Sequence, residues 1–331
     1  MQNLTGSYYI LGYSISEQWD GRYHEVKVVA KRKGLDIHAQ SGYFNPKPFK
    51  EYSDLEKRLH LFDLALNERP MFQTPMTFSI VPLSYATGEE TCLLVLSKLQ
   101  NKAIEKFSGI KVELISLIFD EQENLMNLGR SDADLGRYRG MDVYFTSGAT
   151  LQPGNFKCRL VIRDLETGDA AVASAMAHVA RKNVAGLSLH SPLLLIPESN
   201  FVYLEAGTAK NKGMMEWKDA YPFDRARYSP TVGEVSKSTA RILAVIPCSV
   251  TGLVQPAVEI AAFLINADSG ERIPISFSIL DKTQKDNLEI HFIEVALQDV
   301  PRGTYLLYFH AEDAASKAVS YAQTALVIRQ F

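Results

Sequence analysis

The sequence predicts a mainly β protein, with an N-terminal β-meander and one amphipathic helix followed by two β-sandwich domains. Three observations support this prediction. Short runs rich in β-branched and aromatic residues recur between turn-forming residues along most of the chain. A single segment has the apolar period of a helix. Two groups of strand-like runs repeat the same residue pattern at a nearly constant offset.

The composition is typical of a globular protein. Of 331 residues, 46% are hydrophobic and 22% are charged, and the formal net charge is −3. This length suits two or three domains, each large enough to bury a core. The charge balance offers no basic field for nucleic acid, and no apolar stretch has the length of a membrane helix. The N-terminus as given shows no signal-peptide pattern. We therefore expect a soluble protein with neither nucleic-acid binding nor membrane insertion.

Residues 1–48 are predicted to form the meander. Turn-forming pairs, Asp20-Gly21 and Lys33-Gly34, separate its β-rich runs. The expected strands are residues 7–14, 23–30 and 35–40. Three strands with one apolar face are marginally stable alone, so this face needs a cover.

Residues 49–70 are predicted to form a helical linker. Ser53 and Glu56 have the spacing of a capping box at the start of a helix. The apolar stripe of this helix consists of Leu55, Leu59, Phe62 and Leu66. We expect the stripe to cover the meander, and the meander residues it would cover are Tyr9, Leu11, Val26 and Val28.

Residues 71–198 and 199–331 are predicted to form two immunoglobulin-like sandwiches. Each region contains six or seven short strand-like runs joined by turns, without long helices between them. The first set is residues 76–85, 91–99, 110–120, 141–146, 155–164, 171–179 and 189–196. The second set is residues 239–247, 258–267, 273–280, 288–296, 304–311 and 320–328.

The two sets share a residue pattern, which indicates that one architecture is repeated along the chain. Val112 to Asp120 matches Val258 to Asn266, which lies 146 residues later. A second pair of segments begins at Gly154 and Gly303, and each has an aromatic residue two positions on and an aspartate ten positions on. An offset this long indicates two domains of one fold class and is too long for a solenoid repeat.

The cysteines offer one candidate disulfide. Cys92 lies in the candidate second strand of the first sandwich, and Cys158 follows the corner aromatic Phe156. These are the positions that the inter-sheet bridge of an immunoglobulin-like domain joins. The second repeat has Leu307 in place of Cys158, so the alternative is two reduced, buried thiols that face each other. We expect Cys248 to be free.

An aromatic-rich segment between the two sandwiches is the candidate binding site. Large apolar side chains at this density are either buried or used for binding. The segment contains Met214, Met215, Trp217, Tyr221, Phe223 and Tyr228. They either present a surface to a protein partner or a glycan, or they fill the junction between the sandwiches.

Acidic residues suggest a weak candidate metal site. Asp132 and Asp134 lie on one side of a turn, with Asp120 upstream, and carboxylate oxygens suit calcium. The alternative is a solvated loop whose charge is neutralised by nearby arginines. The zinc-protease, serine-hydrolase, dinucleotide and P-loop patterns are all missing from the sequence. We therefore predict no catalytic residues and no cofactor.

Several segments resemble bacterial proteins of the von Willebrand factor A (VWA)-related type. The matching segments are residues 8–13 (YYILGY), 20–28 (DGRYHEVKV), 42–46 (GYFNP), 151–156 (LQPGNF), 186–191 (GLSLHS) and 221–230 (YPFDRARYSP). The first three resemble the end of the VWA-related domain, and the others resemble the modules behind it. The Asp-x-Ser-x-Ser metal-binding triplet of a VWA domain does not occur. The resemblance thus implies the C-terminal portion of such a protein, without the VWA domain proper.

The resemblance implies an extracytoplasmic protein, periplasmic or secreted. On this basis we expect a non-enzymatic binding or structural module of a bacterial envelope or secreted protein, with a protein as its partner. The alternative is an accessory carbohydrate-binding module that uses Trp217, Tyr221 and Phe223. A hydrolase whose residues converge from distant strands is a third hypothesis.

Overall fold

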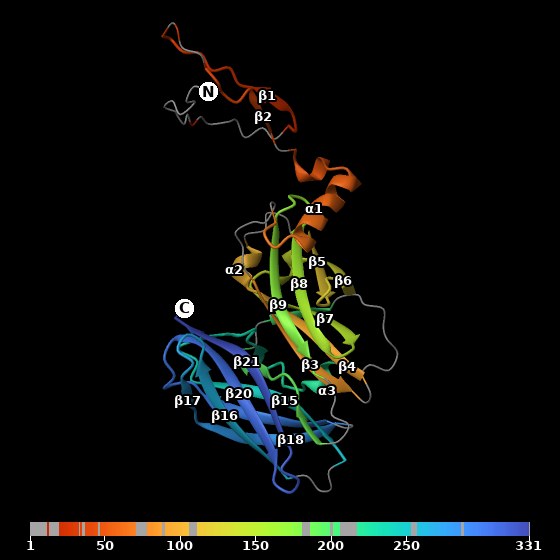
Figure 1. The fold of residues 1–331 in the computed structure, drawn as a ribbon, viewed down its shortest axis with the longest axis vertical. Helices are drawn as coiled ribbons and strands as arrows, with labels where there is room; N and C mark the ends of the chain where they lie inside the picture. The colour runs from red at the N-terminus through yellow and green to blue at the C-terminus, as the bar shows by residue number, and fades with distance from the viewer. Residues whose placement is uncertain are drawn as a thin grey trace, which may run out of the picture. The chain divides into compact units, whose positions relative to one another are not determined.

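The computed structural model describes most of the chain, in two compact units that comprise Met1–Leu59 and His60–Phe331 (Figure 1). The described residues are 12, 20–32, 34, 37–45, 47–70, 78–87, 90–105, 111–180, 186–198, 201–205, 217–252, 257–285 and 288–330.

The N-terminal unit contains one short antiparallel ladder. β1 (Tyr23–Glu25) pairs with β2 (Gly42–Phe44). Gly42 has no room for a side chain, because a Cβ atom there would lie 2.3 Å from the carbonyl oxygen of His24. Of the strand expected at 23–30, only Tyr23–Glu25 is a strand. The strand expected at 35–40 is wrong, because its described residues, 37–40, are not in a strand. Except for Gly12, the expected strand at 7–14 lies outside the described residues.

The predicted capping box is confirmed at the start of α1 (Asp54–Leu66), which follows the 3-10 helix η1 (Phe49–Glu51). The Ser53 N–H donates to the Glu56 carboxylate at 2.6 Å, and the Glu56 N–H donates to Ser53 Oγ at 3.3 Å. The bonds from Ser53, together with Lys47, lower the pKa of Glu56 to about 2. The helix therefore begins where the local sequence predicts.

The predicted buried stripe of α1 is wrong. Leu55, Leu59, Phe62 and Leu66 are 57% to 66% exposed. The buried positions are His60, Leu64 and Ala65, which lie on another side of the helix. Leu64 and Ala65 belong to the second unit and pack against β-strands of that same unit. The prediction followed the apolar period of the sequence, whereas tertiary packing buries the side that carries His60, Leu64 and Ala65.

The first half of the second unit is a pair of four-stranded sheets. Sheet 1 has the order β6 (Leu125–Asp134), β5 (Lys111–Phe119), β8 (Gly154–Asp164), β9 (Ala170–Val179). Sheet 2 has the order β12 (Phe201–Glu205), β7 (Asp142–Leu151), β4 (Glu90–Leu99), β3 (Ser79–Thr87). The short helices α2 (Asn101–Ile104) and η2 (Leu135–Tyr138) connect their strands.

The second half is another pair of sheets, followed in Figure 1 toward the blue C-terminus. Sheet 3 has the order β13 (Ser229–Pro230), β11 (Leu193–Ile196), β15 (Arg241–Thr251), β19 (Leu288–Ala296), β18 (Phe277–Lys285), and β10 (Gly186–Leu189) also pairs with β15. Sheet 4 has the order β14 (Glu234–Ser236), β21 (Val319–Arg329), β20 (Gly303–Asp313), β16 (Val258–Asn266), β17 (Arg272–Pro274). The short helix α3 (Trp217–Ala220) precedes β13.

Strands cross the expected domain boundary at 198/199. β10 and β11 precede this boundary, yet both pair with β15 of the second sandwich. β12 follows the boundary, yet it runs parallel to β7 of the first sandwich. All four residues of β11 are buried, because sheet 3 is covered on both faces. The two sandwiches therefore interlock.

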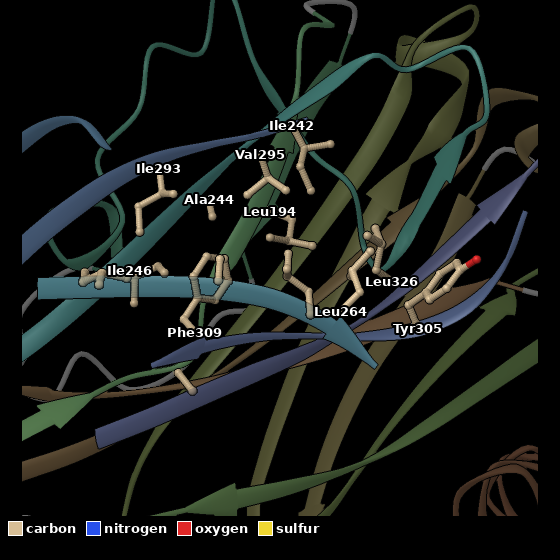
Figure 2. Close-up of a cluster of buried hydrophobic side chains, with 14 of the residues drawn as sticks. Leu194, Ile242, Ala244, Ile246, Leu264, Ile293, Val295, Tyr305, Phe309 and Leu326 are labelled. Carbon is tan, nitrogen blue, oxygen red and sulfur yellow. The ribbon is translucent and has the colours of Figure 1, made fainter. Parts of the chain in front are cut away.

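The four sheets form one stack with three cores between them. Sheets 1 and 2 enclose the first core, sheets 2 and 3 the second, and sheets 3 and 4 the third. Figure 2 shows the third core, where Ile246 and Ile293 of sheet 3 face Leu264 and Phe309 of sheet 4. The strands of sheets 2 and 3 that lie between these cores are thus buried on both faces, whereas β18 at the edge of sheet 3 is exposed over most of its length. In the part of the chain that the structure describes, sheets 1 and 4 form the two ends of the stack.

The predicted internal repeat is visible in the strand order. Sheet 1 reads β6-β5-β8-β9, and sheet 4 contains β17-β16-β20-β21 in the same arrangement. The matched aspartates are equivalent as well. Asp164 accepts bonds from the N–H groups of Glu166 and Thr167, and Asp313 accepts from those of Ala257 and Ser316. Each carboxylate thus holds the turn that follows its strand.

Candidate binding surface

The predicted aromatic segment lies mostly inside the second core. Trp217 is 8% exposed and Tyr221 is 1% exposed, and the Tyr221 hydroxyl donates to the carbonyl oxygen of Ser191 at 2.9 Å. Phe223 and Tyr228 are partly buried against the same core. Met214 and Met215 lie outside the described residues. As a correction, Trp217 and Tyr221 present no exposed platform, because they fill the junction between sheets 2 and 3.

The three candidate calcium ligands do not come together. Asp120 accepts bonds from Gln122 and Asn124 in the turn before β6, and the bond from the Asn124 side chain is the main cause of its lowered pKa. Asp132 and Asp134 lie at the opposite end of β6, where Asp134 accepts from the N–H of Gly136. β6 was expected to be a loop, and its extended backbone separates the carboxylates. The described residues contain no group of three side chains suited to a metal ion.

The candidate disulfide is also wrong. Cys92, Cys158 and Cys248 are all free and buried. Cys92 belongs to the second core, whereas Cys158 belongs to the first, so their side chains leave sheet 2 and sheet 1 toward different layers. Burial raises the pKa of Cys158 and of Cys248 to about 12, so both thiols are protonated and poorly reactive.

The interior offers little space for a ligand. A small apolar cleft lies where Leu83 and Leu96 of sheet 2 approach Leu193 and Val232, and its volume of about 10 Å³ is roughly the space of one water molecule. Pockets for small molecules usually measure about 300 to 1,000 Å³. The outward faces of sheets 1 and 4 are therefore the more informative places to look for binding.

The end of α1 covers part of the outward face of sheet 1. Leu64 and Ala65 pack there against Ile115, Leu117 and Val161. Arg159 of β8 is 3% exposed, and its guanidinium donates to the carbonyl oxygen of Leu64 at 2.8 Å and to that of Asn67. Arg159 thus satisfies carbonyl groups that the C-terminus of a helix leaves free.

A network of charged side chains contacts the same helix at His60. Arg163 of β8 donates to Glu113 of β5 at 2.6 Å, and Arg130 lies 2.5 Å from the same carboxylate. The Arg163 guanidinium also lies 3.4 Å from His60 Nδ1. Burial and the nearby Arg163 charge lower the pKa of His60 to about 4, so His60 is neutral and can accept this bond at neutral pH.

The outward face of sheet 4 combines partly exposed aromatic and aliphatic side chains with charged and polar ones. We define the outer face of sheet 4 as the following outward side chains of β16, β17, β20 and β21: Glu259, Ala261, Phe263, Ile265, Arg272, Leu306, Tyr308, His310, Glu312, Tyr321, Gln323 and Ala325. These positions alternate along each strand with core residues such as Leu307 and Phe309. None of the hydrophobic clusters among the described residues includes their side chains.

Aromatic rings occupy the centre of this face. Phe263 and Tyr308 lie opposite each other on β16 and β20, with parallel rings whose centroids are 5.3 Å apart. The Arg272 guanidinium lies 3.9 Å from the centre of the Phe263 ring. In the next row His310 contacts Tyr321 at 4.7 Å, and Tyr321 is 60% exposed. The solvent-facing side of an antiparallel sheet is normally polar, so this side chain set needs an explanation.

The sequence carried a signal for this face that the strand assignment did not use. β20 contains the run Tyr305 to Phe309, in which the core-facing and the outward positions are both apolar. Such a run is typical of a strand covered on both sides.

Comparisons with known proteins supply no family. No protein-family model matches the chain, and no curated protein matches it. Among the described residues, no helix is long and apolar enough to cross a membrane.

Proposed function

We propose that this chain is a non-enzymatic binding module that engages a protein partner through the outer face of sheet 4. The observation that carries the proposal is the composition of that face, whose centre is aromatic and whose charges are peripheral. Exposed apolar patches of this kind mark protein interaction sites, and aromatic residues dominate the energy of such interfaces. At the opposite end of the stack, the end of α1 covers part of the outward face of sheet 1 through Leu64 and Ala65, while Met176 of that sheet stays 68% exposed.

The strand order supports a finer fold assignment for both sandwiches. In each, a sheet of four neighbouring strands of the type β6-β5-β8-β9 faces a sheet that contains an adjacent antiparallel pair, β4 and β7 or β15 and β19. The Tyr305 hydroxyl donates to the carbonyl oxygen of Pro301 at 2.9 Å, which resembles the tyrosine corner of immunoglobulin-like domains. We propose that both sandwiches are of this type, a fold that many cell-surface binding modules share.

The wider setting is also a proposal. The segments at residues 8–13, 20–28 and 42–46 resemble the end of a VWA-related domain, which supports assignment to the C-terminal portion of an exported bacterial protein of that type. Such a protein acts in the periplasm or outside the cell. The partner would then be another protein of the envelope or the cell exterior.

Site-specific photo-cross-linking tests the proposed binding function. A photoreactive phenylalanine analogue replaces Tyr308 in one preparation of the full chain and Lys285 of β18 in another. We expect discrete protein adducts at position 308 in an envelope extract of the source organism, and an excess of unlabelled chain should suppress them. The Tyr308→Glu chain should not compete. Adducts of equal yield at both positions, or none at position 308, would contradict the proposal.

A further inference from the structure

We infer that the partner accepted by the outer face of sheet 4 is a second copy of this chain, related to the first by a two-fold axis. This inference rests on the proposed function, because it names the occupant of the same face. The chain itself supplies the precedent for the packing mode. Sheets 2 and 3 of one chain already pack face to face, and Tyr85 and Tyr144 of sheet 2 share the second core with Leu243 and Val245 of sheet 3.

The outer face of sheet 4 has the size that such an interface needs. Its three long strands contain 9, 11 and 11 residues. With strands about 4.8 Å apart and about 3.3 Å of rise per residue, the face covers roughly 500 Å² before the relief of the side chains is counted. Two copies then bury about 1,000 Å² or more, which is the lower limit for a specific protein interface.

The distribution of charge suits a partner that is identical. In a two-fold interface the residues near the axis meet their own copies, so a charge at the centre would face a like charge. Phe263, Tyr308 and Gln323 at the centre of this face carry no formal charge, and the one charge that reaches them among the contacts described is the Arg272 guanidinium, which lies over the Phe263 ring. Arg272 lies on the edge strand β17, and Glu259 and Glu312 lie opposite each other in the row at one end.

The ring geometry adds to this argument. Phe263 and Tyr308 are held parallel by the sheet register, and the cation of Arg272 further restricts Phe263. Rigid aromatic side chains lose little conformational entropy when they are buried in an interface.

Sedimentation velocity of the full chain tests the inference. We expect the wild-type protein to change from monomer to dimer between about 1 and about 100 µM. Tyr308→Glu places a charge opposite its own copy and should raise the dimer dissociation constant at least about 100-fold. Gln323→Arg, at an exposed and already polar position of β21, provides a second variant whose fold is not at risk.

Two matched controls separate this face from the other exposed apolar positions. Leu280→Glu changes a residue of β18 that is 54% exposed, and Leu59→Glu changes the exposed stripe of α1. Both should dimerise like the wild type. A wild-type chain that stays monomeric over the whole range overturns the inference, as does dissociation by a control variant but not by Tyr308→Glu or Gln323→Arg. If the chain is monomeric and position 308 still cross-links to a different protein, the proposed function stands and the second copy is rejected.

Discussion

The two outward faces of the stack differ in what packs against them. On sheet 1, the end of α1 covers part of the face, and buried charged groups fix its position: Arg159 at the helix C-terminus and the Arg163–Glu113 pair beside His60. On sheet 4, the described residues place no such cover over Phe263, Tyr308 and Tyr321. Charges lie under the helix on one face and at the rim of the other.

This difference separates an intramolecular contact from an intermolecular one. Buried ion pairs contribute little net stability, but separating the two partners leaves a buried charge unpaired and is strongly destabilising. Such pairs therefore favour one position of a helix that is part of the same chain. An apolar face with a neutral centre can associate and dissociate without leaving a charge unpaired.

The largest effect is expected at the buried pair on sheet 1. Glu113→Gln keeps the shape of the side chain but leaves the Arg163 guanidinium without its counter-charge in a buried site. We expect a loss of about 3 to 5 kcal/mol in the free energy of unfolding, measured by urea denaturation. The control Asp132→Asn changes an exposed partner of Arg130 and should cost less than about 1 kcal/mol. Equal effects of the two changes would show that the buried pair does not fix the helix.

Arg159→Met should cost less but should act locally on α1. The change removes the donor to the carbonyl oxygens of Leu64 and Asn67, and we expect a loss of about 2 to 3 kcal/mol. Hydrogen exchange should accelerate in residues 60–66 before it does so in the sheets. The control Lys157→Met removes the neighbouring ion pair with the exposed Glu68 and should leave exchange in α1 unchanged. Unaltered exchange in Arg159→Met would contradict the capping role.

Helix docking should also depend on pH through His60. Its pKa is about 4 in the folded chain and about 6.5 when unfolded, so between these values only the unfolded state binds the proton. The free energy of unfolding should therefore rise from pH 4 to pH 6.5, by on the order of 2 kcal/mol from this residue. His291 also has a pKa lowered by burial, so the test is the difference between wild type and His60→Gln. The same slope in both proteins would reject the role of His60.

The smallest effect on stability is expected at the outer face of sheet 4. Tyr308→Ser should change the unfolding free energy of the monomer by less than about 1 kcal/mol, because its ring contributes to no core. The adjacent Phe309→Ala removes a fully buried ring and should cost about 3 to 5 kcal/mol. Dilute urea denaturation compares the two. A large loss for Tyr308→Ser would mean that the face serves the fold, which would weaken the binding proposal.

Much of the fold was predictable where local signals agree. The capping box at Ser53 and Glu56 and the repeated segments at Gly154 and Gly303 predicted real structural equivalents. β6 was missed because Gly129 and the polar residues after it resemble a loop, and strand propensity is weak at an exposed edge. Which sheet a strand joins is decided by tertiary packing, so the crossing of β11 and β12 had no local signal.

The candidate site was less predictable for a related reason. The density of large rings around Trp217 correctly indicated either a core or a surface, but composition alone does not tell the two apart. The candidate disulfide failed because Cys92 and Cys158 point to different cores. Successive residues of a strand point to opposite faces of its sheet, so a shift of one position in the strand register moves a side chain to the other face. The outer face of sheet 4 becomes recognisable only once β16, β20 and β21 lie side by side.

Hydroxyl-radical footprinting as a function of protein concentration tests the central claim most directly, because it reads both end faces in one sample. Tyr321 on sheet 4 is 60% exposed, and Met176 on sheet 1 is 68% exposed. We predict that oxidation of Tyr321 falls as concentration rises from about 1 to about 100 µM while oxidation of Met176 stays constant. If Tyr321 is oxidised equally at every concentration, or if both residues become protected together, the outer face of sheet 4 is not the surface through which this chain pairs with its own copy.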